Sequence, residues 1–319
     1  MFYNTAFAPD PTAMTSSVRV EPMLDLRALI GEGPVWEESE QTLLFVDIIG
    51  KSIHRWNALT NQTSSLSTDS TVGFAVPVQG GGYLAGVGCS FSAVNWSTGA
   101  VTSLVTVDND KPQNRFNDGK VDPTGRLFAG TMGDIEASPV LWKQGSLFSL
   151  DSELTLLRHF GQVDISNGLD WSSDGSLFFY VDSMKKTLDV FDYDVVTGLP
   201  AARRVVYEMR EEEGLPDGLT VDSEGMVWVS CFNGGRVLRI DPSTGVRLQT
   251  VLLPVSKTTS CCFGGPQYND LYVTSASVGL SQSELSAQPL AGATFRVSGL
   301  GVKGRPPVEF SGNVWKRKD

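Results

Sequence analysis

Short apolar runs separated by polar turns make up nearly all of the chain from about residue 18 onward. Typical runs are Leu43–Asp47, Tyr83–Val87 and Leu177–Asp182, each rich in β-branched or aromatic residues and bounded by Gly, Pro, Asn or Asp. Runs of this length and composition are typical of β-strands. No stretch carries the apolar stripe of period 3.6 that predicts an amphipathic helix. The pattern therefore predicts an all-β protein.

One motif recurs at equal intervals along the chain. It starts with a polar residue, continues through a polar turn that ends in Gly, and leads into an apolar strand. The polar residues are Asn117, Asn167 and Asp217, and the turn glycines are Gly125, Gly175 and Gly225. Equal spacing of both features indicates a repeated supersecondary unit.

Six units of about 40 to 50 residues, each with about four strands, predict a six-bladed β-propeller in a single domain. A solenoid or a β-sandwich is the alternative. We expect the short N-terminal strand at Val18–Val20 to pair with the last blade, because this closes the ring and removes a free sheet edge. The propeller is assigned to residues 17–312, with flexible segments at 1–16 and 313–319.

Composition and charge narrow the class of protein. Hydrophobic residues make up 41% of the chain and charged residues 19%, as in ordinary globular proteins. The net charge of −11 disfavours nucleic acids and anionic membranes as partners. No apolar run approaches the roughly 20 residues that span a bilayer, and the first sixteen residues do not resemble a secretory signal.

These features predict a cytoplasmic protein, with the nucleus left open, and a monomer. In a reducing compartment the cysteines should be buried free thiols, because their spacing fits neither a metal site nor a disulfide framework. They are Cys89, Cys231, Cys261 and Cys262.

The repeated polar residues suggest chemistry in the central channel. The first strand of each propeller blade lines the channel, so Asn117, Asn167 and Asp217 should face a common axis. The first unit adds Glu32, whereas the remaining two units place apolar or thiol side chains there, around Phe74 and Cys261.

Two carboxylates at close range resist ionising together. A hard divalent cation removes this conflict, because carboxylate and amide oxygens suit calcium, magnesium or manganese. Asn-Gly and Asp-Gly pairs are also common turn residues, so a purely structural role stays open at this stage.

The two histidines, His54 and His159, are isolated in strand-like surroundings. A Ser-His-Asp or Cys-His catalytic group is therefore poorly supported, as is a zinc site built on several histidines. Both histidines are expected to be surface or packing residues.

Several stretches resemble signatures of the regucalcin (senescence marker protein)/gluconolactonase family and are close to its animal members. The resemblance runs from about Val18 to Gly304 and implies a six-bladed propeller with metal-dependent lactonase activity. The stretches are Glu32-Gly33-Pro34-Val35-Trp36, Arg115-Phe116-Asn117-Asp118-Gly119, Ser166-Asn167-Gly168-Leu169-Asp170-Trp171, Phe232-Asn233-Gly234-Gly235 and Lys257-Thr258-Thr259-Ser260.

The resemblance also implies roles for individual residues. It assigns Glu32, Asn167 and Asp217 as ligands of one divalent cation, with calcium expected first and zinc, magnesium or manganese open. It assigns Arg115 and Asn117 to the substrate. Family members place an acidic residue of the loop after Gly-Thr-Met near the substrate as well. Here that loop contains Asp134 and Glu136, of which we select Glu136.

The implied reaction is hydrolysis of a sugar lactone such as D-glucono-1,5-lactone to the aldonic acid. The cation would act as a Lewis acid, and Asp217 would act as general base or proton shuttle. Two alternatives remain. One is a calcium-binding regulatory protein without enzymatic activity, and the other is a relative that acts on another ester, a thioester or a phosphotriester.

Overall fold

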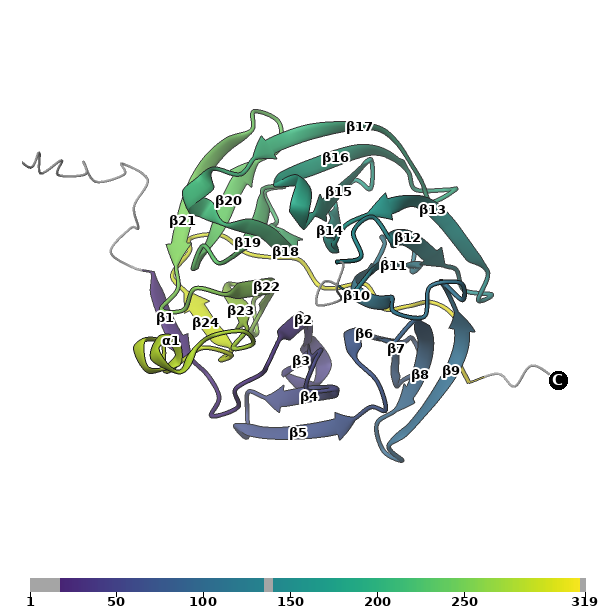
Figure 1. Ribbon diagram of the computed structural model, residues 1–319, viewed down its shortest axis with the longest axis horizontal. Coiled ribbons are helices and arrows are strands. Elements are labelled where there is room, and N and C mark those ends of the chain that lie inside the picture. Colours follow the sequence, from purple (N-terminus) through teal and green to yellow (C-terminus); the bar gives the residue numbers. More distant parts are fainter. Residues whose placement is uncertain (1–17, 135–139, 316–319) are drawn as a thin grey trace, which may run out of the picture.

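A computed structural model describes residues 18–134 and 140–315 of the chain. Six four-stranded antiparallel sheets surround a central channel (Figure 1). The predicted six-bladed β-propeller is therefore confirmed. Predicted strand positions agree closely with the observed ones. The predicted runs Tyr83–Val87 and Leu177–Asp182, for example, coincide with two observed strands.

Each blade is named here by its place along the chain, and its strands are given from the channel outward. Blade 1 contains β2 (Gly31–Glu37), β3 (Thr42–Asp47), β4 (Ser52–Asn57) and β5 (Gln62–Ser67). Blade 2 contains β6 (Val72–Pro77), β7 (Tyr83–Val87), β8 (Ser90–Asn95) and β9 (Ala100–Thr106). Blade 3 contains β10 (Arg115–Val121), β11 (Leu127–Met132), β12 (Gly145–Leu150) and β13 (Leu156–Val163).

The second half of the ring has the same organisation. Blade 4 contains β14 (Ser166–Trp171), β15 (Leu177–Asp182), β16 (Thr187–Asp194) and β17 (Leu199–Glu208). Blade 5 contains β18 (Leu215–Val221), β19 (Val227–Phe232), β20 (Arg236–Asp241) and β21 (Val246–Leu252). Blade 6 contains β22 (Thr258–Gly264), β23 (Asp270–Ser275), β24 (Phe295–Ser298) and, from the other end of the chain, β1 (Arg19–Pro22).

The N-terminal strand closes the ring as predicted. Strand β1 pairs antiparallel with β24, so that Arg19 lies opposite Ser298 and Pro22 lies opposite Phe295. Because β1 forms the outer edge of blade 6, the first and last strands of the chain share one sheet (Figure 1).

Helical structure is sparse. One short α-helix, α1 (Gln282–Ala287), lies between β23 and β24, and single 3₁₀ turns occur at Glu38–Glu40, Ser183–Lys185 and Glu211–Glu213. Helix α1 escapes the sequence prediction because it spans only 6 residues and contains no buried side chain. A Ser281–Glu284 capping box starts it, with the Ser281 hydroxyl accepting a hydrogen bond from the Glu284 amide. Within the described residues, no helix is long and apolar enough to cross a bilayer.

The core consists of apolar side chains packed within and between blades. Fully buried aromatic residues dominate it, including Trp36, Trp171 and Trp228. Trp171, for example, packs against Phe178 with ring centroids 5.0 Å apart. All four cysteines are free; three are buried as predicted, whereas Cys89 is only half-buried.

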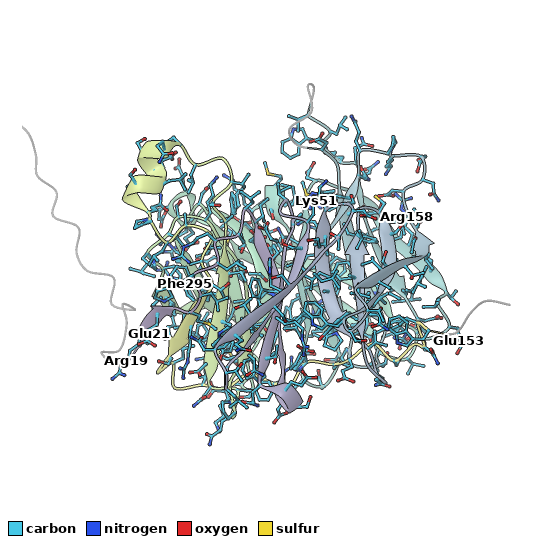
Figure 2. All side chains as sticks on the ribbon, turned by 90° about the horizontal axis from the view of Figure 1, so that it is seen from below. Arg19, Glu21, Lys51, Glu153, Arg158 and Phe295 are labelled. Atoms are coloured by element: carbon cyan, nitrogen blue, oxygen red, sulfur yellow. The ribbon has the colours of Figure 1, made fainter. Side chains whose placement is uncertain are left out.

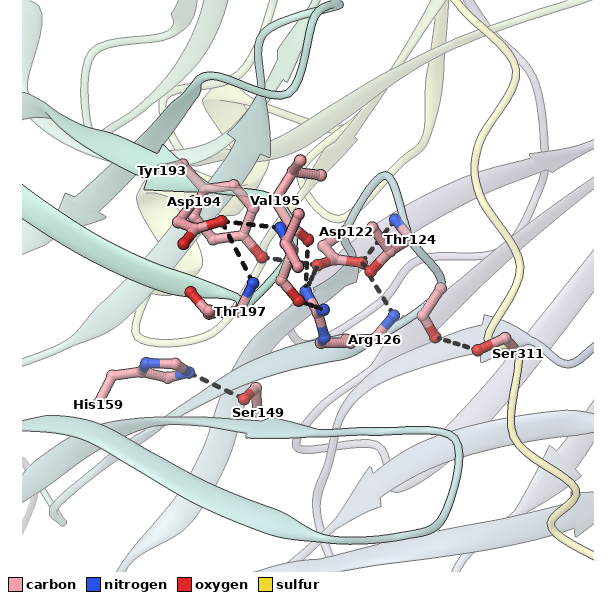
Figure 3. Close-up of polar contacts among 12 residues, drawn as sticks. Asp122, Thr124, Arg126, Ser149, His159, Tyr193, Asp194, Val195, Thr197 and Ser311 are labelled. Atoms are coloured by element: carbon pink, nitrogen blue, oxygen red, sulfur yellow. Dashed lines mark hydrogen bonds and ion pairs between the residues drawn. The ribbon is translucent and has the colours of Figure 1, made fainter.

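In blades 3 and 5 an aspartate at its start, Asp122 or Asp222, holds the repeated turn. In blade 3, Asp122 Oδ1 accepts hydrogen bonds from the backbone amides of Thr124 and Arg126, at 2.8 and 2.9 Å (Figure 3). Asp122 Oδ2 accepts from the hydroxyl of Tyr193 in blade 4 at 2.6 Å. The same carboxylate thus shapes the turn and ties two neighbouring blades together.

Residues 300–315, called the strap here, run beneath the ring after the last strand. The strap is the yellow segment that crosses the centre of Figure 1. It contacts several blades through hydrogen bonds: Arg305 Nη2 to Trp171 O (2.7 Å), Phe310 N to Pro77 O (2.9 Å), Ser311 N to Gly125 O (3.0 Å) and Trp315 Nε1 to Gly81 O (3.0 Å). Figure 3 shows Ser311 beside the turn of blade 3.

The strap extends past residue 312, the predicted end of the propeller. Val314 is buried and belongs to the same apolar cluster as Phe310. Packing against the propeller therefore continues at least to Trp315. Residues 1–17 and 316–319 lie outside the described part of the chain, so the predictions for the terminal segments stay predictions.

Candidate metal centre at one end of the channel

A local irregularity in every innermost strand prepares the site. Near its start each of these strands shifts register against its neighbour, as in β14 between Ser166 and Leu169 and in β18 between Pro216 and Leu219. The same shift occurs in β2, β6, β10 and β22. Bulges re-aim side chains and are common beside functional sites. Here six of them form a ring at one end of the channel.

The predicted metal ligands meet at this end. Glu32 from β2, Asn167 from β14 and Asp217 from β18 are only 3%, 4% and 6% exposed. Burial and the nearby charge of Asp217 raise the pKa of Glu32 well above its usual range. Burial, followed by the charge of Asp118, raises the pKa of Asp217 in the same way. Side chains from blades that are not neighbours are thus close enough to oppose each other's ionisation.

Two glycines allow the innermost strands to approach so closely. A Cβ on Gly168 would lie 2.5 Å from the carbonyl oxygen of Asp217, and a Cβ on Gly218 would lie 2.0 Å from Ser260 Oγ. Each glycine follows a predicted ligand directly in the sequence. Any side chain at these positions would push neighbouring blades apart, so both glycines help to bring the ligands together.

The hydrogen bonds at the site leave two oxygens without a partner. The Asn167 Nδ2 donates to Ser183 Oγ at 3.0 Å, which fixes the amide and leaves Asn167 Oδ1 unbonded. Asp217 Oδ1 is also buried without a hydrogen-bond partner. Buried unsatisfied oxygens are costly, and carboxylate and amide oxygens are the ligands that hard divalent cations prefer. These residues therefore fit a divalent cation.

The rest of the donor set agrees with a hard cation bound by oxygen. Among residues 18–134 and 140–315, no group of three or more His, Cys, Asp or Glu side chains is assembled as a metal cluster. The centre instead combines two carboxylates with a carboxamide. His54 and His159 hydrogen-bond to serine hydroxyls within their blades. Both histidines pack as predicted, and burial lowers the pKa of each.

Arg115 and Asn117 form a second pair beside the metal centre. Arg115 Nη1 donates to Asn117 Oδ1 at 2.7 Å, and Asn117 Nδ2 donates to the carbonyl oxygen of Ser166 at 2.8 Å. Burial lowers the pKa of Arg115 to about 10, while the charges of Glu32, Asp134 and Asp217 act in the opposite direction. The guanidinium is therefore within electrostatic reach of the metal-centre carboxylates.

Comparisons with known proteins show the family of the chain. A family model described as SMP-30/Gluconolactonase/LRE-like region matches residues 30–277. The chain belongs to this family. It is 51% identical over 298 residues to regucalcin from Danio rerio, a match that covers 93% of this chain and all of that protein.

Two solved structures extend the comparison. A luciferin-regenerating enzyme is 34% identical with a TM-score of 0.87, covering 92% of this chain and 99% of that one. A regucalcin from Agrobacterium tumefaciens, described as a calcium-binding protein, is 26% identical with a TM-score of 0.85, covering 91% of this chain and 96% of that one.

One assignment taken from the family falls outside the described residues. Glu136 belongs to the segment 135–139, so its predicted contact with substrate stays a prediction. The other acidic residue of this loop, Asp134, is described. Its charge acts on Arg115, which places it near the mouth of the channel.

The structure adds a third carboxylate that the sequence analysis did not select. Asp118 follows Asn117 in β10 and is 7% exposed. Burial raises the pKa of Asp118 to about 6, and its charge acts on both Glu32 and Asp217. In a regular strand, adjacent residues point in opposite directions. The bulge between Phe116 and Asp118 lets both Asn117 and Asp118 reach the site, and sequence spacing alone does not reveal it.

In the two blades without a predicted ligand, the structure corrects which residues take the equivalent positions. In β6 the register shift contains Gly73 and Phe74, and in β22 it contains Thr259 and Ser260, whereas Cys261 pairs with Val273 outside it. The first residue of each shift, Gly73 or Thr259, takes the place that Asn167 has in β14. Thr259 Oγ1 donates to the carbonyl oxygen of Gly31, and Phe74 packs edge-on against Phe116. These positions support the fold and give the centre no charged ligand, as the sequence analysis expected.

Proposed function

We propose that this protein is a divalent-metal-dependent lactonase that hydrolyses sugar lactones such as D-glucono-1,5-lactone to the aldonic acid. The observation that carries the proposal is the pair of buried, unpartnered oxygens on Asn167 and Asp217 beside the carboxylate of Glu32. The family description, which includes gluconolactonase, supports this choice of reaction.

Glu32, Asn167 and Asp217 would hold the cation, which we expect to be calcium, with zinc, magnesium or manganese as alternatives. When bound, such an ion polarises a lactone carbonyl and offsets the negative charge that develops on its oxygen. Its positive charge would also let Glu32 and Asp217 ionise together, which burial and mutual repulsion otherwise oppose.

The remaining roles belong to side chains of the chain itself. The carboxylate of Asp217 is suited to accept a proton from the attacking water and to pass it to the ring oxygen of the lactone, which becomes a hydroxyl as its bond to the carbonyl carbon breaks. Arg115 and Asn117, linked by their 2.7 Å hydrogen bond, would orient the hydroxyls of the sugar ring. One acidic residue of the loop after Gly-Thr-Met would also contact the substrate, and we assign this role to Glu136, with Asp134 as the alternative.

The test is hydrolysis of D-glucono-1,5-lactone by metal-stripped protein, with calcium, magnesium, manganese and zinc added back one at a time. We expect activity to return with a divalent cation and to be absent in Asp217→Ala. Folded protein that binds calcium but hydrolyses no lactone would contradict the proposal.

That contrary outcome would favour a calcium-binding regulatory protein. This second candidate is supported by the description of the Agrobacterium tumefaciens relative as calcium-binding. A panel of other esters, thioesters and phosphotriesters, assayed on the same preparations, would detect a relative with a different substrate class.

A further inference from the structure

We propose that the strap end of the channel is a second binding site, which takes a small organic monocarboxylate with an apolar body. This end lies opposite the metal centre. The metal-centre residues occupy the starts of the innermost strands, whereas the strap passes the ends of the same strands. Figure 2 shows the two ends from the side, with Lys51 towards the metal-centre end and Glu153 towards the strap end.

A cavity of about 250 Å³ occupies the space between the strap and the propeller. Its wall is mainly apolar and combines strand ends with strap residues, among them Pro34, Trp36, Val76, Trp171, Pro306 and Val308. Ser173 and Pro306 also line the cavity and are exposed, so it reaches the molecular surface. A ligand can therefore enter from solvent and place an apolar group against this wall.

The charged side chains that line the cavity have a net positive charge. Lys120 Nζ lies 2.7 Å from Asp170 Oδ2, and Arg305 Nη2 lies 3.9 Å from Asp170 Oδ1. One carboxylate thus serves two cations, which leaves an excess of one positive charge. Asp170 also accepts hydrogen bonds from the backbone amides of Trp171 and Val221. Its acceptor capacity is largely used.

The two cations keep free surface. The side chains of Lys120 and Arg305 are 30% and 29% exposed, although both residues line the cavity. An anion entering the cavity would therefore meet available donors, while an entering cation would meet a carboxylate that is already shared.

Unpaired donors surround the same cavity. Within the described residues, three buried side-chain N–H groups have no hydrogen-bond partner: Trp36 Nε1, Trp171 Nε1 and Arg305 Nε. All three residues line this cavity. These N–H groups lie behind the wall, so we do not count them as direct ligands. Direct contacts to an anion would come from Lys120 and Arg305, whose side chains keep exposed surface.

The mainly apolar wall restricts which groups a ligand can carry besides its carboxylate. Beyond the charged groups, its polar side chains are the hydroxyls of Ser173 and Thr220. A polyhydroxylated acid would leave hydroxyl groups without partners here, at a cost in free energy. The site therefore differs in specificity from the proposed lactonase site, and aldonic acids are not its ligands.

The test uses benzoate as the anionic probe and benzamide as its neutral isostere, each titrated into the full-length protein by isothermal calorimetry. We expect benzoate to bind at least tenfold more tightly than benzamide. Arg305→Met should weaken benzoate binding at least tenfold, and Arg305→Lys should recover most of that loss because it keeps the charge. Lys303→Met is the matched control on the exposed face of the strap and should change the affinity less than twofold.

Equal affinity for benzoate and benzamide, or benzoate binding unaffected by Arg305→Met, would overturn the inference. So would a benzoate-soaked crystal with the ligand only at Glu32 and Asp217. Asp217→Ala should bind benzoate as the wild type does, so that failure of the lactonase proposal and failure of this one give different results.

Discussion

The two ends of the channel are built from the same six strands and have opposite chemistry. The starts of the strands gather acceptors: the carboxylates of Glu32, Asp118 and Asp217 and the amide oxygen of Asn167. The ends of the strands carry an excess of one positive charge, because Lys120 and Arg305, which the strap adds, share the single carboxylate of Asp170. Each innermost strand starts at one end of the channel and finishes at the other. A repeat of about fifty residues can therefore give the two ends of the channel different chemistry.

This comparison predicts that the two ends act independently. Five experiments test it, ordered from the largest expected effect to the smallest.

Asp217→Ala should lower kcat/KM for D-glucono-1,5-lactone by roughly a thousandfold or more, because it removes both a metal ligand and the proposed base. Steady-state kinetics on protein shown to be folded by circular dichroism checks this. Asp110→Ala removes a carboxylate from an exposed turn and serves as the control, with wild-type activity expected. Wild-type turnover in Asp217→Ala would remove Asp217 from the mechanism.

Adding a divalent cation at a hundred times its Kd should stabilise the folded protein by about 2.7 kcal/mol, roughly a hundredfold in the unfolding equilibrium. Differential scanning calorimetry with and without calcium measures this. Glu32→Gln should abolish most of the gain. Stabilisation that survives in Glu32→Gln would show that the cation binds elsewhere.

Glu32 and Asp217 also determine how the stability of the metal-free protein changes with pH. The folded-state pKa values of Glu32 and Asp217 lie above their unfolded values of about 4. The folded form therefore binds more protons in this window, and the stability contributed by the pair falls as pH rises from about 4 through the folded pKa values.

Because other groups titrate as well, the quantity to measure is the difference in Tm between wild type and Asp217→Asn, at pH 6 and at pH 8. The Tm of wild type minus that of Asp217→Asn should be larger at pH 6 than at pH 8. Saturating calcium should remove this change with pH. A constant difference across this range would contradict the raised pKa values.

Arg115→Met should lower kcat/KM by about ten- to a hundredfold while metal affinity stays unchanged, because Arg115 is assigned to the substrate and not to the cation. Asn117→Ala should have a smaller effect. Since the two side chains are hydrogen-bonded at 2.7 Å, the double variant should lose less than the sum of the single losses. Full additivity would show that the pair does not act as a unit.

Ser311→Ala should cost only about 0.5 to 1.5 kcal/mol of stability, because it removes one side-chain hydrogen bond, from Ser311 Oγ to Gly125 O at 3.2 Å. Lactonase activity should not change. Urea denaturation and kinetics on the same sample check both statements. A clear loss of activity would show that strap and metal centre are coupled, contrary to the comparison above.

The sequence was sufficient for the architecture because strands, turns and their period are local features. The spacing of Asn117, Asn167 and Asp217 correctly placed these residues on equivalent innermost strands. Glu32 was selected from the first unit, although the strand after it begins a few residues further on than in the other units.

What the sequence did not reveal depends on non-local contacts. The bulges that turn Asp118 towards the site, and that put Gly73 and Thr259 first in the register shifts of β6 and β22, are set by pairing between strands. The strap has no periodicity, so its last residues read as a flexible tail although Val314 is buried. The excess positive charge at Asp170 arises from Lys120 and Arg305, which lie far from it in the sequence.

The pairing of β1 with β24 has a consequence for synthesis on the ribosome. Arg19 and its partner Ser298 are 279 residues apart, so one strand of blade 6 is translated first and the other three nearly last. At 5 to 20 residues per second, β1 waits roughly 15 to 60 seconds for its partner. During that interval the nascent chain carries an unpaired strand at one end and an incomplete sheet at the other. This is the stage at which a chaperone that recognises exposed strand edges would protect the chain.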